Sequence, residues 1–103
     1  MATGKEFCES HINSGKKVVI FSKSSCPFCA KVKDLFKSMN LGDELEIIEL
    51  DLREDCEECR DHLASVTGAR SYPRVFIKGK SIGGCDDTMQ LHESGELAKM
   101  LDS

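Results

Sequence analysis

The hydrophobic pattern of this chain alternates between the period of a strand and the period of a helix, with turn-forming residues between the segments. A β-branched run at 17–21 predicts a short buried strand, and the residues from Pro27 onward predict a helix with one apolar face. Pro27 suits the first position of that helix, because a missing N–H costs nothing there. The alternation predicts an α/β fold.

The other segments continue this alternation of helices and strands. The first half of the chain should form a helix capped by Thr3 and Glu6 and ended by Gly15, the strand 17–21, and the helix from Pro27 to Gly42. A strand at 46–50 and a helix capped by Asp51 and Glu54 and ended by Gly68 should follow. The last part should form a hairpin of 74–78 and 81–82 and a helical region capped by Asp87 and Gln90 and broken at 94–96. The third helix should turn Cys59, Leu63 and Val66 inward. This order implies a central four-stranded sheet, parallel at first and ending in an antiparallel hairpin, with flanking helices.

Composition limits the organisation and the partners. A chain of 103 residues with 40% hydrophobic residues suits one domain, 1–103. Its net charge is -4 and its lysines and arginines are scattered, which argues against nucleic-acid binding. We find neither an apolar signal segment at the start nor a membrane span, so we expect a cytoplasmic protein that does not bind membranes. In that compartment the six cysteines are expected to be reduced, catalytic or metal-binding.

Cys26 and Cys29 form a Cys-x2-Cys pair at the predicted start of a helix. A cysteine there faces free backbone N–H groups and the positive end of the helix dipole, which favour the thiolate. Lys23, in the same loop, adds a cationic field. Cys29 lies one turn further along, where it can attack a mixed disulfide on Cys26. We therefore expect Cys26 to be the nucleophile of a thiol-disulfide oxidoreductase, near the carboxyl end of a strand.

A second pair, Cys56 and Cys59, leaves an alternative open. Two Cys-x2-Cys pairs separated by 26 residues have the spacing of a structural zinc site, or of a non-enzymatic redox-sensing module. The first pair follows a strand and opens a helix, which favours redox chemistry and no bound metal. The second pair lies among four carboxylates, which disfavour thiolates, and we expect both cysteines to be packing residues.

Three motifs together resemble a dithiol glutaredoxin: Lys23-Ser24-Ser25-Cys26-Pro27-Phe28-Cys29, Ser71-Tyr72-Pro73 and Gly83-Gly84-Cys85-Asp86-Asp87. The resemblance extends over nearly the whole chain. The absence of Trp, with Pro27 directly after Cys26, argues against the thioredoxin branch. The resemblance implies a thioredoxin-like fold and glutathione as reducing co-substrate, with no tightly bound cofactor. It also implies that Cys26 is the nucleophile and Cys29 the resolving cysteine.

The resemblance also implies a glutathione site. Its residues would be Lys23, Phe28, Arg60, Tyr72, Pro73, Gly84, Cys85 and Asp86. Pro73 would be cis, Lys23 would attract the glycine carboxylate, and Asp86 would meet the ammonium of the γ-glutamyl group. Two positions depart from the family pattern: Phe28 stands where Tyr is usual, and Tyr72 places a bulky ring where Val is usual.

The resemblance further implies two reactions. Cys26 alone would reduce glutathione–protein mixed disulfides, whereas Cys26 and Cys29 together would reduce protein disulfides. The expected partners are glutathione, glutathionylated or disulfide-containing proteins and, indirectly, glutathione reductase. We expect the protein to be a monomer.

Overall fold

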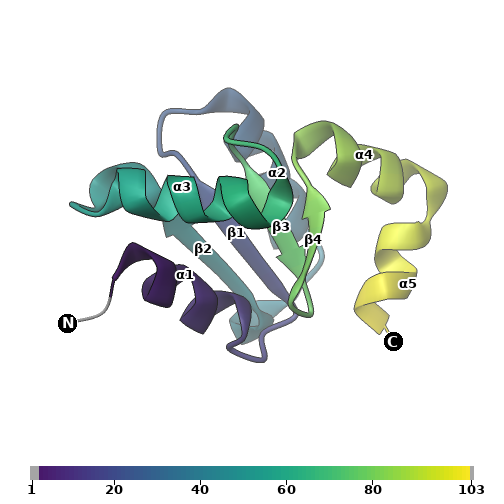
Figure 1. Cartoon of the computed structure of the whole chain (residues 1–103). Coiled ribbons are helices and arrows are strands. Elements are labelled where there is room, and N and C mark those ends of the chain that lie inside the picture. The colour runs from purple at the N-terminus through teal and green to yellow at the C-terminus, as the bar shows by residue number, and fades with distance from the viewer. Residues whose placement is uncertain (1–2, 103) are drawn as a thin grey trace.

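The computed structural model describes residues 3–102 and shows a four-stranded mixed sheet between two layers of helices (Figure 1). The strands are β1 (Val18–Ser22), β2 (Leu45–Glu49), β3 (Arg74–Ile77) and β4 (Lys80–Gly83), in the order β2-β1-β3-β4. β1 pairs with β2 in parallel and with β3 antiparallel, and β3 and β4 form a hairpin. The predicted α/β class and mixed sheet are confirmed. Met1, Ala2 and Ser103, part of the predicted domain 1–103, lie outside the described residues.

The helices divide between the two faces of the sheet. They are α1 (Gly4–Ile12), α2 (Pro27–Lys37), α3 (Cys56–Thr67), α4 (Cys85–Ser94) and α5 (Glu96–Asp102), with short 3-10 turns η1 (Gly42–Glu44) and η2 (Leu50–Leu52). α1 and α3 lie side by side on one face, while α2, α4 and α5 pack on the other (Figure 1). Within residues 3–102, no helix combines the length and the apolar character that crossing a bilayer requires.

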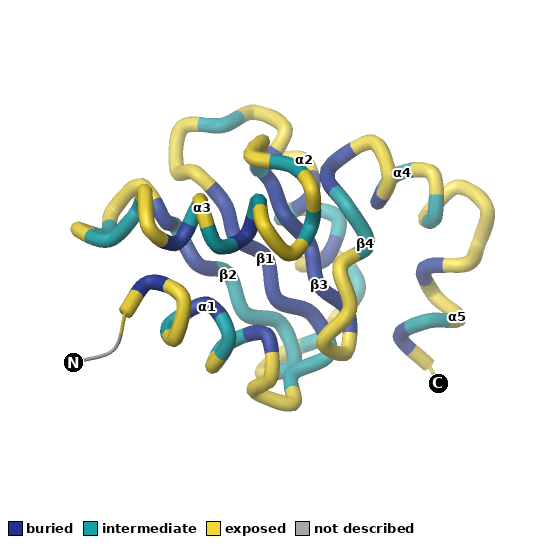
Figure 2. The backbone as a smooth tube through the Cα atoms, in the orientation of Figure 1, coloured by how far each residue is buried: buried dark blue, intermediate teal, exposed yellow. Residues whose placement is uncertain are grey.

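β1 forms the centre of the core, and all five of its residues are buried (Figure 2). Val19 and Phe21 face α1 and α3, whereas Val18 and Ile20 face α2 and α5. Alternate side chains of a strand point to opposite faces, so a strand covered on both sides needs apolar residues at successive positions. This requirement explains the continuous apolar run recognised in the sequence.

The start of α3 corrects one prediction. Asp51 and Glu54 were expected to cap this helix, but residues 50–52 form η2 and α3 begins at Cys56, after Asp55. Asp51 instead accepts hydrogen bonds from Ser24 across the sheet edge. Cys59 and Leu63 point inward as predicted. The inward position of Val66 was wrong, because this side chain is 49% exposed.

Other element ends differ by a few residues. α1 begins with the predicted cap, in which Thr3 Oγ1 accepts the N–H of Glu6 at 3.1 Å, but it ends at Ile12 and not at Gly15. α2 ends at Lys37: the Ser38 N–H is shared between the carbonyls of Asp34 and Leu35, and the Met39 N–H bonds to the carbonyl of Phe36, three positions back, which tightens the last turn. β2 covers 45–49 where 46–50 was expected. α4 begins at Cys85, so the predicted cap by Asp87 and Gln90 was wrong.

Candidate active site

Cys26 and Cys29 lie where the chain leaves β1 and enters α2. Cys26 is the N-cap residue of α2, with Pro27 as the first helical residue, and the backbone N–H of Cys29 donates to Sγ of Cys26 at 3.3 Å. This is the contact with a free helix N–H that the sequence predicted for Cys26. Cys26 is half-buried, while Cys29 is fully buried. Of the two sulfurs, only that of Cys26 belongs to a partly exposed residue.

The two thiols differ in acidity as well as in access. Burial alone would raise the pKa of Cys26, but hydrogen bonds from the Cys29 thiol and from the N–H groups of Cys29 and Phe28 lower it below the ordinary thiol value. The charge of Lys23 adds to this lowering. At Cys29, burial and the hydrogen bond with Cys26 raise the pKa to about 12. The site therefore favours the thiolate form at Cys26 and the protonated form at Cys29.

The loop before Cys26 is hydrogen-bonded to η2, the short turn that follows β2. Ser24 donates its backbone N–H to Oδ1 of Asp51 at 2.9 Å and its hydroxyl to Oδ2. These bonds lower the pKa of the Asp51 carboxyl. Sequence reasoning missed this role of Asp51. The signal was available, because parallel strands end at the same edge of a sheet and Asp51 follows β2 as Ser24 follows β1.

A groove of about 210 Å³ lies beside these cysteines. It is lined by Phe28, Ser71, Tyr72, Arg74, Gly84, Cys85, Asp86 and Asp87. The structure therefore brings together five of the residues predicted for glutathione: Phe28, Tyr72, Gly84, Cys85 and Asp86. Pro73 is buried next to Tyr72, and the bond between them is cis as the resemblance implies. Lys23 and Arg60 do not line this groove.

Arg74 and Gly84 form one side of the groove in close contact. A Cβ on Gly84 would lie 2.5 Å from Nη2 of Arg74, so this position admits only glycine without movement of the guanidinium. Arg74 is buried, donates from Nε to the carbonyl of Pro73 at 2.9 Å, and has its pKa lowered by burial, an effect that Asp87 opposes. Sequence reasoning placed Arg74 in a strand and missed its position in the groove. No local motif distinguishes it from any other first residue of a strand.

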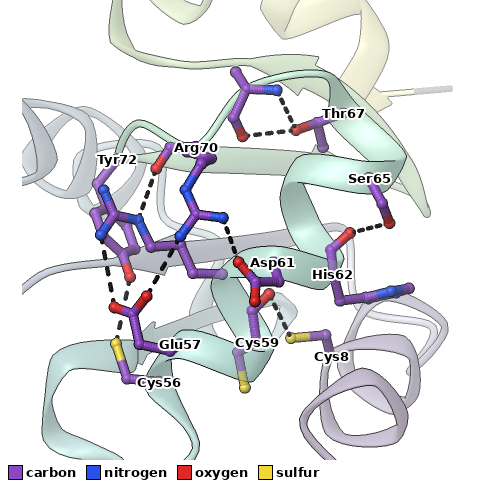
Figure 3. Close-up of polar contacts among 12 residues, drawn as sticks. Cys8, Cys56, Glu57, Cys59, Asp61, His62, Ser65, Thr67, Arg70 and Tyr72 are labelled. Atoms are coloured by element: carbon purple, nitrogen blue, oxygen red, sulfur yellow. Dashed lines mark hydrogen bonds and ion pairs between the residues drawn. The ribbon is translucent and has the colours of Figure 1, made fainter.

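Arg60 lies against Tyr72 and contacts neighbouring groups of the chain. Its Nε donates to the carbonyl of Arg70 at 3.2 Å, and its guanidinium carbon lies 5.5 Å from the centre of the Tyr72 ring. The Tyr72 hydroxyl in turn contacts the thiol of Cys56 (Figure 3). Arg60 thus contacts Tyr72, which lines the groove, without lining the groove itself.

The second cysteine pair is separate from the first. Cys59 is buried between α3 and α1, where its Sγ contacts the carbonyl of Gly4 and its own carbonyl contacts Sγ of Cys8. Burial raises the pKa of Cys59, and Asp55 adds to the effect, so the predicted acidic surroundings are the lesser cause. Among residues 3–102, no three His, Cys, Asp or Glu side chains are grouped so that they could hold a metal ion. The geometry does not favour a zinc site built from both pairs.

Comparison with known proteins agrees with this geometry. A family model described as Glutaredoxin matches residues 18–82. Glutaredoxin-C8 of Oryza sativa subsp. japonica is 47% identical, over 97% of this chain and 76% of the rice protein, and Glutaredoxin-C6 of the same plant is 51% identical, over 82% and 73%. The crystal structure of wheat glutaredoxin superposes with a TM-score of 0.88 at 44% identity, covering 96% of this chain and 91% of that one. A buckwheat glutaredoxin–glutathione complex gives 0.88 at 39% identity, with 96% and 87% covered.

Proposed function

Since this chain belongs to the glutaredoxin family of oxidoreductases, with its thioredoxin-like fold, we propose that it is a glutathione-dependent thiol-disulfide oxidoreductase with two modes. It reduces glutathione–protein mixed disulfides through Cys26, and protein disulfides through Cys26 and Cys29. The observation that carries this proposal is the inequality of the two thiols. Cys26 is partly exposed with a lowered pKa, and Cys29 is buried with a pKa of about 12.

In the first mode, the Cys26 thiolate attacks the glutathione sulfur of a mixed disulfide. The sulfur–sulfur bond of the substrate breaks, the protein thiolate leaves, and glutathione remains bound to Cys26 through a new disulfide. The thiolate of a second glutathione attacks this glutathione sulfur, which releases glutathione disulfide and restores Cys26. Cys29 takes no part in this mode.

In the second mode, Cys26 attacks a protein disulfide and forms a mixed disulfide with the substrate. Cys29 then gives up its proton and attacks Sγ of Cys26, so the substrate leaves with both of its thiols reduced. Two glutathione molecules reduce the resulting Cys26–Cys29 disulfide in successive exchanges. The protonated state of Cys29 keeps it from competing with Cys26 in the first attack.

The groove supports glutathione as the co-substrate. The N–H groups at Gly84 and Cys85 lie at the start of α4 and suit the γ-glutamyl carboxylate, which would take the Gly84 N–H from its present acceptor, Oδ2 of Asp87. Asp86 suits the ammonium of the same group. Phe28 and Tyr72 line the groove, and Pro73 is buried next to Tyr72. Lys23 and Arg60 would attract the glycine carboxylate from the groove's edge. The buckwheat relative, crystallised as a glutathione complex, supports glutathione as the co-substrate.

The cellular setting is part of the same proposal. A cytoplasmic pool of glutathione, kept reduced by glutathione reductase, would regenerate the enzyme after each turnover. Glutathionylated proteins and disulfide-containing proteins would be its macromolecular substrates. The domain 1–103 would act as a monomer, since one chain supplies both cysteines and the groove.

A comparison of Cys26→Ser with Cys29→Ser tests this function. Cys26→Ser should abolish turnover of a glutathionylated peptide and reduction of a protein disulfide, because the attacking sulfur is gone. Cys29→Ser should keep the first activity and lose the second. Both are measured by coupling to glutathione reductase. Equal loss of the two activities in a folded Cys29→Ser protein would overturn the division between the modes.

A further inference from the structure

One wall of the glutathione groove is connected to α3 by a set of side-chain contacts. Tyr72 lines the groove, and its hydroxyl lies 3.6 Å from Sγ of Cys56 in the first turn of α3. Figure 3 shows Tyr72 directed toward Cys56, with Glu57 and Arg70 beside them. Both Tyr72 and Cys56 are half-buried and pack against the core between α1, α3 and the sheet. The ring is therefore held at its hydroxyl end by a residue outside the groove.

The backbone before Tyr72 is fixed to the same helix. Arg70 pairs with Asp61 and, at 3.4 Å, with Glu57, while its carbonyl accepts the Nε–H of Arg60. The guanidinium of Arg60 also lies over the Tyr72 ring. The segment is thus attached to α3 at residue 70 through exposed charges and at residue 72 through a less exposed contact. Exposed ion pairs contribute little. The contact with Cys56 is the polar contact of the Tyr72 hydroxyl, while the ring itself packs against the core and Arg60.

We propose that Cys56 is a positioning residue for the glutathione groove: its thiol holds the hydroxyl of Tyr72 and thereby fixes the ring that forms one wall. Cys56 exchanges no electrons in this role. With the contact intact, the ring stays against α3 and leaves the groove open for glutathione. Without it, the ring rotates about its side-chain bonds and competes with the peptide for the groove.

This inference rests on the proposed glutathione site, and it gives Cys56, which was expected to be a packing residue, a role in that site. Cys56→Ala removes the contact and leaves Cys26 untouched. The KM for glutathionylated peptide should rise about two- to fivefold with unchanged kcat, the low end of what one hydrogen bond contributes, because sulfur bonds weakly. Cys56→Ser places a hydroxyl where the thiol was, so the contact with Tyr72 can still form and the KM should stay close to the wild-type value. Ser65→Ala, on the exposed part of α3, is the matched control.

A double-mutant cycle shows whether Cys56 acts through Tyr72. Tyr72→Phe removes the hydroxyl and should raise KM as Cys56→Ala does, and adding Cys56→Ala to Tyr72→Phe should change nothing more. Wild-type KM in folded Cys56→Ala, or additive effects of the two changes, would overturn the proposal. Thermal unfolding of every variant shows which proteins are folded.

A spectroscopic measurement tests the contact without glutathione. Tyr72 is the single tyrosine of the chain, which has no tryptophan, so the tyrosinate absorbance reports this residue alone. Burial, followed by the contact with Cys56, raises the pKa of Tyr72 above the ordinary tyrosine value. Cys56→Ala should lower this pKa, and Ser65→Ala should not; an unchanged titration in Cys56→Ala would contradict the contact. If the wild-type protein fails to use glutathione, the proposed function is wrong. The titration does not depend on glutathione, so it still tests the contact between Cys56 and Tyr72.

Discussion

Cys26 and Cys29 have different environments although only two residues separate them. Cys26 precedes the first turn of α2 and receives hydrogen bonds from residues of that turn, whereas Cys29 lies within the turn and faces the core. The same hydrogen bond between the two sulfurs lowers the pKa of Cys26 and adds to the rise at Cys29. The geometry of one helix start therefore creates both the nucleophile and its protonated partner.

Alkylation with a small neutral reagent should show this difference as a function of pH. Thiols react as thiolates, so the labelling rate rises as pH passes the pKa, and the lowered pKa of Cys26 moves its rise to lower pH than that of a free cysteine. Peptide mapping in mildly acidic buffer should find Cys26 labelled and Cys29 unlabelled. Cys29→Ala removes a hydrogen bond to Cys26 and should shift the rise toward higher pH. A profile for Cys26 like that of a free cysteine would contradict this account.

The sequence was sufficient for residues whose chemistry depends on local position. Cys26 could be placed because a strand followed by Pro27 defines a helix start. Gly84 to Asp86 were placed only by the resemblance to glutaredoxins, since the helix start predicted from the residues lay at Asp87 and not at Cys85. Arg74 and Asp51 could not be recognised in this way. Their roles depend on residues that follow neighbouring strands, Gly84 for Arg74 and Ser24 for Asp51. The parallel pairing of β1 and β2 gave a signal for the second contact, but residue spacing gave none for the first.

The contact between α1 and α3 supports the helix that carries Cys56. Gly4 donates its N–H to Oε1 of Glu58 at 2.8 Å, and the two helices approach so closely that a Cβ on Gly4 would lie 2.8 Å from Cβ of Glu58. It would also lie 2.9 Å from the backbone N of Cys59, which cannot move without moving α3. Gly4 is therefore required by helix packing.

Gly4→Ala should destabilise the protein by about 1 to 3 kcal/mol, the usual cost of overpacking. Alanine favours a helix over glycine by about 1 kcal/mol, so the clash outweighs the gain in propensity. The urea midpoint measures the difference. Lys5→Ala, at the next and exposed position of α1, is the control and should leave the midpoint nearly unchanged. If Gly4→Ala unfolds at the wild-type urea concentration, α1 can move away from α3 without loss of stability, which would contradict this prediction.

Element types were predicted better than element ends. The apolar periods identified the four strands and the longer helices, because burial on a sheet face imposes those periods directly. The starts of α3 and α4 were misplaced, since acidic residues near a helix start resemble caps whether they cap or not. Asp51 matches the local pattern of a helix cap, but its carboxylate accepts a hydrogen bond from Ser24 and does not cap α3.

At the scale of the molecule, the sheet joins two apolar clusters. One lies under α1 and α3 and the other under α2, α4 and α5, and adjacent residues of β1 contribute to each in turn. Neither cluster can lose its packing without disturbing the central strand. We therefore expect the domain to unfold as one unit.

Thermal unfolding followed by two signals tests this expectation. Tyrosine fluorescence reports Tyr72 at the groove wall, and far-ultraviolet circular dichroism reports all helices and strands together. The two curves should coincide, with one midpoint. An earlier fluorescence transition would show that the groove wall opens before the core and would contradict a single cooperative unit.

The complete burial of Cys29 determines how the enzyme responds to its surroundings. Glutathione that reduces a Cys26–Cys29 disulfide would reach only the sulfur of Cys26, so reduction would pass through a Cys26–glutathione mixed disulfide, the species that also forms when glutathione disulfide oxidises the protein. Forward and reverse turnover then share every intermediate, and neither direction is built into the protein. The ratio of reduced to oxidised glutathione would set the direction of net electron flow. Such a protein would bring its partners' thiols into equilibrium with that ratio, adding or removing glutathione as the ratio changes.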